Sequence, residues 1–88
     1  MLHDRPDYNE RIQDSAGIIP EDEPVFLLRA QDKLAPDILF YYTACLMERF
    51  EMKHNDPMVV AIKDQGLAMR KWQRSNPTKI ADAPASGN

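Results

Sequence analysis

The chain has 88 residues, of which 43% are hydrophobic and 28% charged, and its formal net charge at pH 7 is −3. This length accommodates one small domain, and the composition is that of a folded protein rather than of a wholly disordered one. A single cysteine, Cys45, excludes an internal disulfide and a multi-cysteine zinc site. Because no apolar run is long enough to cross a bilayer, we expect a cytoplasmic protein with no membrane segment.

The charge is distributed unevenly along the chain. Residues 1–56 contain 6 basic and 12 acidic side chains, whereas residues 57–88 contain 5 basic and 2 acidic ones. Opposite poles favour self-association or docking on a charged partner. The alternative is that these charges simply follow the exposed faces of helices and tails.

Composition and proline positions divide the chain into an arm, a helical domain and a tail. Residues 1–20 are expected to form an extended arm, with a turn or two of helix within "DYNERIQDSAG". The helical domain is expected over residues 21–75. Residues 76–88 are small, polar and punctuated by proline, which predicts a disordered tail.

Three prolines, Pro24, Pro36 and Pro57, each precede a run that is compatible with a helix. Proline at the first helical position costs no hydrogen bond, because the N–H it lacks would have no partner inside the helix. The prolines therefore predict a short helix at 24–32 and two longer helices at 36–53 and 57–74.

The stretch "NDPM", which begins at Asn55, separates the two longer helices. Asn55 is suited to the left-handed conformation that ends a helix, and Asp56 is a good N-cap for a helix that begins at Pro57. The connection is then about two residues long, which makes the flanking helices neighbours in an αα-hairpin. The predicted fold class is all-α, a short helix followed by this hairpin.

The helix predicted at 36–53 is apolar nearly all round, since Thr43 is the only clearly polar residue of "ILFYYTACLM". Such a helix must be covered on several sides. The neighbouring helices offer one apolar stripe each, contributed by Val25, Phe26, Leu28, Val59, Ile62, Met69 and Trp72. We expect a homo-oligomer in which Phe40, Tyr41 and Tyr42 contact a second copy. The alternative is that the N-terminal arm covers them through Tyr8, Ile12, Ile18 and Ile19.

Gly66 interrupts the predicted third helix, where glycine costs roughly 1 kcal/mol relative to alanine. It shares a stripe with Val59, Ile62 and Met69, so its missing side chain predicts close approach of another backbone. A kink or a floor for a ligand is the alternative.

Residues suited to catalysis are scattered. His3 lies in the arm and His54 at a helix end, and Cys45 and His54 point to nearly opposite faces of one helix. Cys45 is expected to be a small buried hydrophobe. The acidic run at 21–23 is best explained as capping of the following helix. We predict no catalytic residues, no metal site and no cofactor, so the chain is not expected to be an enzyme.

The end of the third helix, "MRKWQR", is the best candidate binding site. Basic side chains attract phosphates, and an indole stacks on bases. The predicted ligand-binding residues are Arg70, Lys71, Trp72 and Arg74, with Lys63 and Arg29 reaching the same ligand. Cations in a last helical turn also favour the helix dipole, which is the alternative explanation. Long nucleic acid is not an expected partner, because the acidic half would repel it.

The stretch "IPEDEPVFLLRAQDKLAP" (19–36) and the later "AMRKWQ" resemble segments of small accessory proteins of bacteriophages and prophages. The resemblance covers half to two-thirds of the chain, and it carries no catalytic residues across. It implies a phage-type protein, in the host cytoplasm, that binds and disables a host protein or sequesters a small signalling molecule. The stretch "FYYTACLM" does not match that group.

The sequence thus predicts a non-enzymatic, helical accessory protein that acts by binding. Its expected partner is a host protein or a small anionic ligand such as a signalling nucleotide. The alternative is a structural or assembly protein whose homo-oligomer is itself the function.

Overall fold

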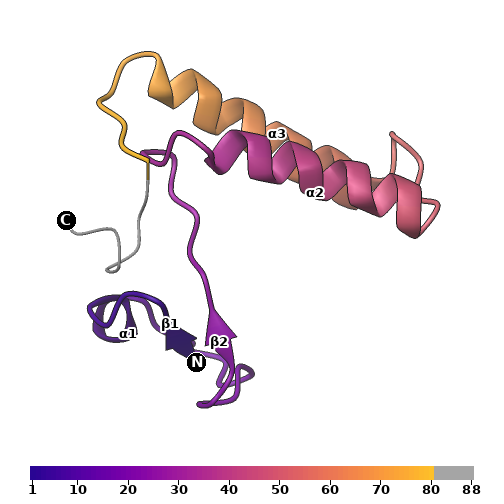
Figure 1. Ribbon diagram of the computed structural model, residues 1–88. Helices are drawn as coiled ribbons and strands as arrows, with labels where there is room; N and C mark the ends of the chain where they lie inside the picture. The colour runs from indigo at the N-terminus through magenta and orange to yellow at the C-terminus, as the bar shows by residue number, and fades with distance from the viewer. Residues whose placement is uncertain (81–88) are drawn as a thin grey trace. The chain divides into compact units, whose positions relative to one another are not determined.

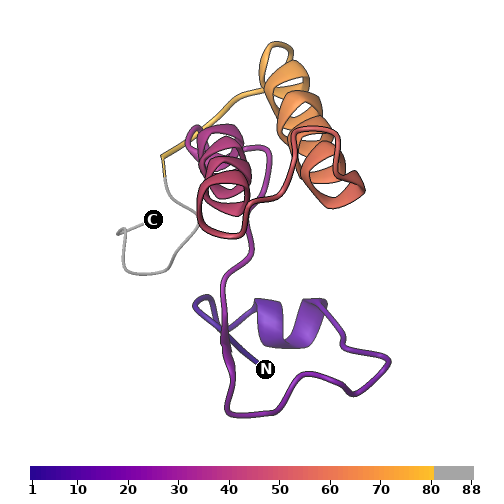
Figure 2. The same cartoon turned by 90° about the vertical axis from the view of Figure 1, so that its right-hand side faces the viewer.

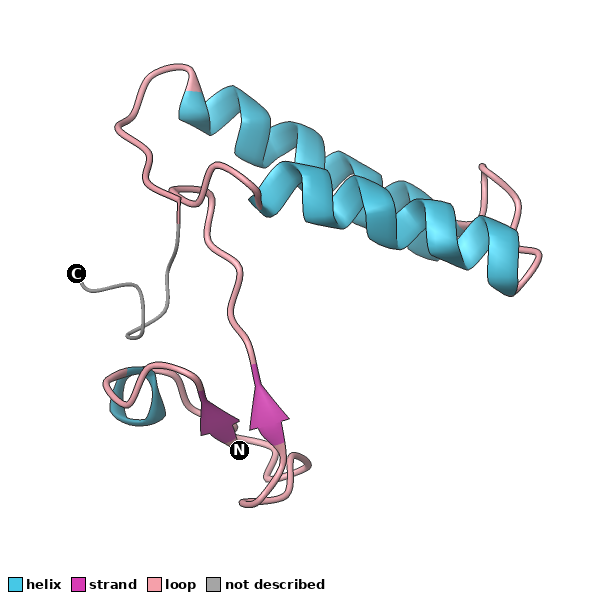
Figure 3. Cartoon of the chain, viewed as in Figure 1, coloured by secondary structure: helices cyan, strands magenta, loops and turns pink. Residues whose placement is uncertain are grey.

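A computed structural model of the protein describes residues 1–80, which form two compact units, Met1–Leu28 and Arg29–Ile80 (Figure 1). The elements in chain order are strand β1 (Leu2–His3), helix α1 (Tyr8–Arg11), strand β2 (Pro24–Val25), helix α2 (Ala35–Arg49) and helix α3 (Pro57–Gln73). The chain is mainly helical, as predicted, with two main helices. The all-α class is only approximate, because β1 and β2 pair as a small sheet (Figure 3).

The sheet of the N-terminal unit replaces the short helix predicted at 24–32, and that prediction was wrong. β1 and β2 pair in parallel, with Leu2 opposite Pro24, and the Leu2 N–H donates to the Glu23 carbonyl at 2.7 Å. Proline is tolerated as the first residue of a strand as well as of a helix. The following β-branched Val25 favours an extended backbone. The boundary between the units therefore falls after Leu28 rather than at residue 20.

Tyr8 is the centre of the N-terminal unit, with 2% of its surface exposed. The Arg5 guanidinium lies 4.4 Å from the ring centroid and donates to the Tyr8 hydroxyl at 3.1 Å, while Arg11 lies 5.5 Å from the centroid. Both arginines also bond Asp7, and these bonds outweigh the effect of desolvation, so the pKa of Asp7 is lowered. The arm is thus a small folded unit held by one ring, with the predicted turn of helix as α1.

The Arg29–Ile80 unit consists of α2 and α3 packed as an antiparallel pair. Of the predicted stripe on α3, Val59, Ile62, Gly66 and Met69 are buried or half-buried, and Gln73 joins them. Trp72, which the sequence analysis placed among the covering residues, is exposed instead. On α2 the buried residues are Ala35, Pro36, Thr43 and Leu46. The hydroxyl of Thr43, the polar residue of the apolar run, is satisfied by donating to the Phe40 carbonyl at 2.7 Å. The two longer helices therefore form the predicted hairpin.

Gly66 is a point of close packing between α3 and the Phe40 ring of α2. A Cβ built at Gly66 would lie 2.7 Å from Cε1 of the Phe40 ring, nearer than any real contact. The predicted close packing at Gly66 is confirmed, although the neighbour is an aromatic side chain rather than a backbone. The same ring is covered on another side by Arg70, whose guanidinium carbon lies 4.8 Å from its centroid.

The connection between α2 and α3 spans residues 50–56 and is longer than the two residues predicted. α2 ends at Arg49, and Glu51 rather than Asn55 adopts the left-handed conformation, with φ of 57°. The start of α3 is as predicted. The Asp56 carboxylate accepts from the Met58 N–H at 2.9 Å, and Pro57 is the first helical residue.

The open end of the pair is closed by two extended segments. The Gln73 side chain donates to the carbonyls of Ala30 and Asp32 at 2.9 and 2.8 Å. The Lys33 N–H donates to the Lys79 carbonyl, and the Lys79 N–H to the Gln31 carbonyl, both at 2.9 Å. The expectation of a disordered tail from residue 76 was therefore wrong for residues 76–80, and its remaining part lies outside the described residues.

Replacing Gly66 with alanine is predicted to destabilise the helix pair. The added methyl would overlap the Phe40 ring, and overpacking of this kind costs about 1–3 kcal/mol, which exceeds the gain of about 1 kcal/mol in helix propensity. The measurement is the urea midpoint of unfolding of the full chain. In a Phe40→Leu background the same substitution is expected to cost less, and an equal loss in both backgrounds would contradict the contact.

Replacing Glu51 with glycine is predicted to stabilise the pair by about 0.5–1 kcal/mol, because glycine adopts positive φ without strain. Thermal unfolding measures the change. Glu51→Ala is the control, since it removes the carboxylate while keeping the strain and is expected to change stability less. A gain from alanine that equals the gain from glycine would assign the effect to charge.

Candidate functional site

The exposed surface of the helix pair divides into two sides, which the helical repeat and one ion pair define. The carboxylate of Asp37 on α2 lies 2.8 Å from the guanidinium of Arg70 on α3, so these two residues share a side. Residues that follow them at helical spacing lie on that side too. On each helix, the residues that lie on the other flank of the buried stripe form the second side. Figure 2 views the pair from the end that carries the 50–56 loop.

The charged side carries both acidic and basic residues. Its members are Asp37, Tyr41, Ala44 and Glu48 on α2, Val60, Lys63, Leu67 and Arg70 on α3, and Arg74 at the C-cap of α3. Acidic residues gather on α2 and basic residues on α3, so the charges oppose one another within the chain. The Arg70 side chain is 49% exposed and that of Asp37 66%, and such an exposed pair contributes little stability.

The uncharged side is nearly free of ionisable groups. Its exposed members are Ile38 and Tyr42 on α2, and Met58, Ala61, Gln65, Ala68 and Trp72 on α3. Within these two helices, Arg49 at the last position of α2 is the one charged residue on this side. The two large rings on this side are Tyr42, which is 49% exposed, and Trp72, which is 43% exposed.

The predicted ligand residues of α3 do not gather on one face. Arg70 and Arg74 lie on the charged side, whereas Trp72 projects to the uncharged side, so the indole and these guanidinium groups point apart. Lys63 lies about two turns before Arg70, toward the other end of the helix. A stacked base clamped by Trp72 and Arg70 together is therefore not supported by this arrangement.

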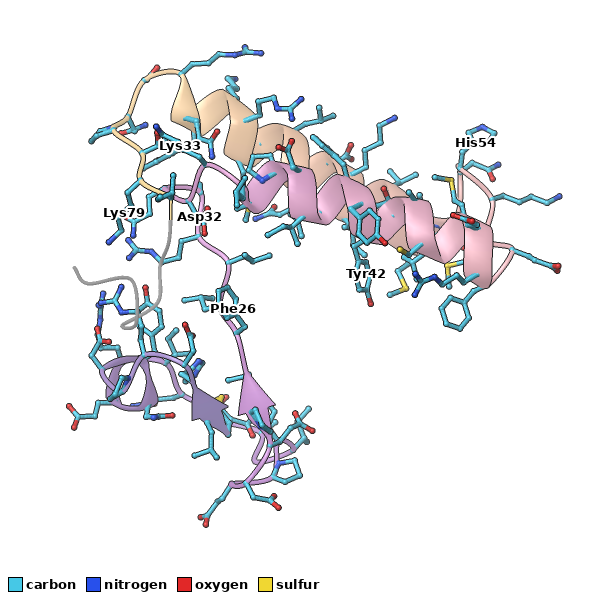
Figure 4. All side chains as sticks on the ribbon, viewed as in Figure 1. Phe26, Asp32, Lys33, Tyr42, His54 and Lys79 are labelled. Atoms are coloured by element: carbon cyan, nitrogen blue, oxygen red, sulfur yellow. The ribbon has the colours of Figure 1, made fainter. Side chains whose placement is uncertain are left out.

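Basic residues instead gather at the end where α2 begins and α3 ends. Gln73 holds the segment after Arg29 at this end, and the pairing of Lys33 with Lys79 adds two lysines (Figure 4). We call this cluster the basic end. It consists of Arg29, Lys33, Arg70, Lys71, Arg74 and Lys79, with Asp32 and Asp37 as its acidic residues.

The contribution of Lys33 and Lys79 was missed by the sequence analysis. They join the basic end because residues 31–33 pair with residue 79. Neither segment has the sequence pattern of a strand, so the sequence carried no signal for this pairing. Asp32 is buried at this junction, and its carboxylate accepts from the Leu34 N–H at 2.8 Å. That hydrogen bond spans Lys33 and stabilises the turn that leads into α2.

The three residues predicted to contact a second copy differ in their surroundings. The Phe40 ring packs against Gly66 and Arg70, so α3 already covers part of it. Tyr41 is 65% exposed on the charged side, and Tyr42 is exposed on the uncharged side. Helix α3 thus covers only part of the apolar surface of α2.

Residues suited to catalysis remain apart. His54 lies exposed in the 50–56 loop, at the end opposite Lys33 and Lys79 (Figure 4). Cys45 is half-buried rather than fully buried, and the hydrogen bond it shares with Tyr41 raises the pKa of that phenol. In the N-terminal unit, the polar side-chain atoms of His3 and Asp4 are buried without a hydrogen-bond partner among the described residues.

Two properties of residues 1–80 bear on the kind of site. No group of three His, Cys, Asp or Glu side chains within residues 1–80 is placed to hold a metal ion. No helix in the same range has the length and apolar character needed to span a membrane.

Comparison of the chain with protein-family models, with curated proteins and with solved structures gives no match. The resemblance to phage accessory proteins accordingly stays a prediction.

Proposed function

We propose that this protein is a non-enzymatic binding protein that captures an anionic partner at the basic end of its helix pair. One observation carries the proposal. Among residues 1–80, folding brings six basic residues from three separate segments of the chain to one end, against two acidic ones. The chain as a whole is acidic, so this concentration of positive charge is not a consequence of composition.

The chemistry of the basic end suits recognition of phosphate or carboxylate groups. Arginine presents a planar fork of donors to an oxyanion, and lysine adds a mobile charge. Lys71 lies in the last turn of α3 and Arg74 caps its end, and neither takes part in the ion pair that holds Arg70 to Asp37. Opposite charge at the edge of a small domain also speeds encounter with an acidic partner.

An accessory role of the phage type agrees with this proposal, since such a protein acts by occupying a host partner or a signalling molecule. Capture requires no nucleophile or general base. The separation of His54 and Cys45 from the basic end is consistent with binding rather than catalysis.

Removing charge from the basic end is predicted to weaken binding. The full chain would be titrated by calorimetry with linear and cyclic nucleotides and, separately, with an acidic peptide. Lys71→Ala/Arg74→Ala is expected to weaken the binding of whichever class gives heat by about tenfold or more, because charge-assisted hydrogen bonds contribute about 1.5–3 kcal/mol each. The affinity should also fall as salt is raised.

The matched control is Lys53→Ala/Lys63→Ala, which removes the same charge outside the basic end. It is expected to change affinity less than about threefold, as surface substitutions elsewhere do. Equal weakening by both double variants would assign the binding to net charge alone. Absence of heat with every anion in the panel would contradict the proposal.

A homo-oligomer whose assembly is itself the function is the second candidate. The observation that favours it is the apolar surface of α2 that α3 leaves exposed, which includes Tyr41, Tyr42 and Ile38. Monomeric proteins rarely expose large contiguous apolar patches.

A further inference from the structure

The uncharged side of the helix pair has the composition of a protein interface. Interface centres are depleted of charge and enriched in aromatic residues and methionine. This side presents Tyr42, Trp72, Ile38 and Met58. The charged side of the same two helices also exposes apolar residues, Tyr41, Val60 and Leu67, but it intersperses them with Asp37, Glu48, Lys63, Arg70 and Arg74. The same two helices build both sides, so the difference between the sides lies in the charge of their side chains.

The occupant that this side fits best is a second copy of the chain. A two-fold interface brings the same surface together with itself, so any charge on it meets a like charge or must find a partner across the axis. Tyr42, Ala61 and Ala68 have no charge to oppose. The charged side is less suited to a two-fold interface, because its acidic and basic residues already oppose one another within one chain, as in the ion pair of Arg70 with Asp37.

The sizes of the side chains are also complementary. The contact of Phe40 with Gly66 sets the level of the two antiparallel helices. Tyr42, two residues further along α2, therefore lies near the level of Gln65, with Ala61 and Ala68 about one turn to either side. Ile38, one turn before Tyr42, lies near the level of Ala68.

We propose that two copies associate through their uncharged sides, with α2 of one copy lying along α3 of the other. A two-fold axis parallel to the helices keeps every residue at its own level. Tyr42 then sits over Gln65 of the second copy, in the hollow between Ala61 and Ala68. Gln65 offers the amide that a buried tyrosine hydroxyl requires. The product is an antiparallel four-helix arrangement, and it is independent of ligand binding at the basic end.

Two adjacent tyrosines provide the test. The full chain would be studied by sedimentation velocity over a range of concentrations, with a reductant present and circular dichroism to check folding. Tyr42→Glu is expected to weaken association at least about a hundredfold, because each pair would bury two unpaired carboxylates. Tyr41→Glu makes the same chemical change on the charged side and is expected to alter association less than about threefold.

A second pair of variants keeps the test decisive where Tyr42→Glu fails to fold. Ala68→Glu on the uncharged side is expected to weaken association as Tyr42→Glu does, and Ala44→Glu on the charged side to leave it nearly unchanged. Both alanines are exposed within helices. A wild-type chain that stays monomeric at all concentrations would overturn the proposal, as would equal or greater weakening by the charged-side variants.

Discussion

The helix pair depends on one close contact, the Phe40 ring against the bare Cα of Gly66. Two packed helices normally have side chains from both of them at the contact. At Gly66 the α3 side chain is missing, so the Phe40 ring of α2 fills the space. The contact fixes how far α2 and α3 are displaced along one another. It also places Arg70 over the same ring and within 2.8 Å of Asp37.

That displacement determines what each surface of the pair contains. With Asp37 level with Arg70, the acidic residues of α2 oppose the basic residues of α3 on one side, and ionisable groups are nearly absent from the other. The same alignment brings the start of α2 beside the end of α3. There the hydrogen bonds of Gln73 and the pairing of the segments around Lys33 and Lys79 bring the residues of the basic end together. Two surfaces of different chemistry therefore follow from one packing contact, and each offers a separate mode of binding.

Features encoded by local sequence were predictable. The cap at Asp56, the start of α3 at Pro57 and the stripe through Val59 and Gly66 depend on spacing within a few residues, and the structure has them as expected. Pro24 was ambiguous, because proline begins a strand or a helix equally well. Only pairing with β1, some twenty residues away, decides between them.

The candidate sites were harder to predict because they arise from tertiary contacts. Thr43, the polar residue of an apolar run, faces the partner helix, while Tyr41 faces solvent, so polarity alone gives the wrong orientation for α2. Trp72 follows Lys71 in sequence, yet its position on the helix directs it away from Arg70. Lys79 belongs to the basic end because it pairs with residues 31–33, and no periodic pattern in the sequence predicts that pairing.

The most direct test of the division into two sides is an isotope-filtered nuclear Overhauser experiment on an equal mixture of labelled and unlabelled full-length chain. It detects protons of one copy that lie within about 5 Å of protons of another. The account predicts intermolecular signals from the Ala68 methyl to the Tyr42 ring and to the methyls of Ile38. Intermolecular signals from the methyls of Val60 and Leu67 on the charged side, with none from Ala68, would contradict it.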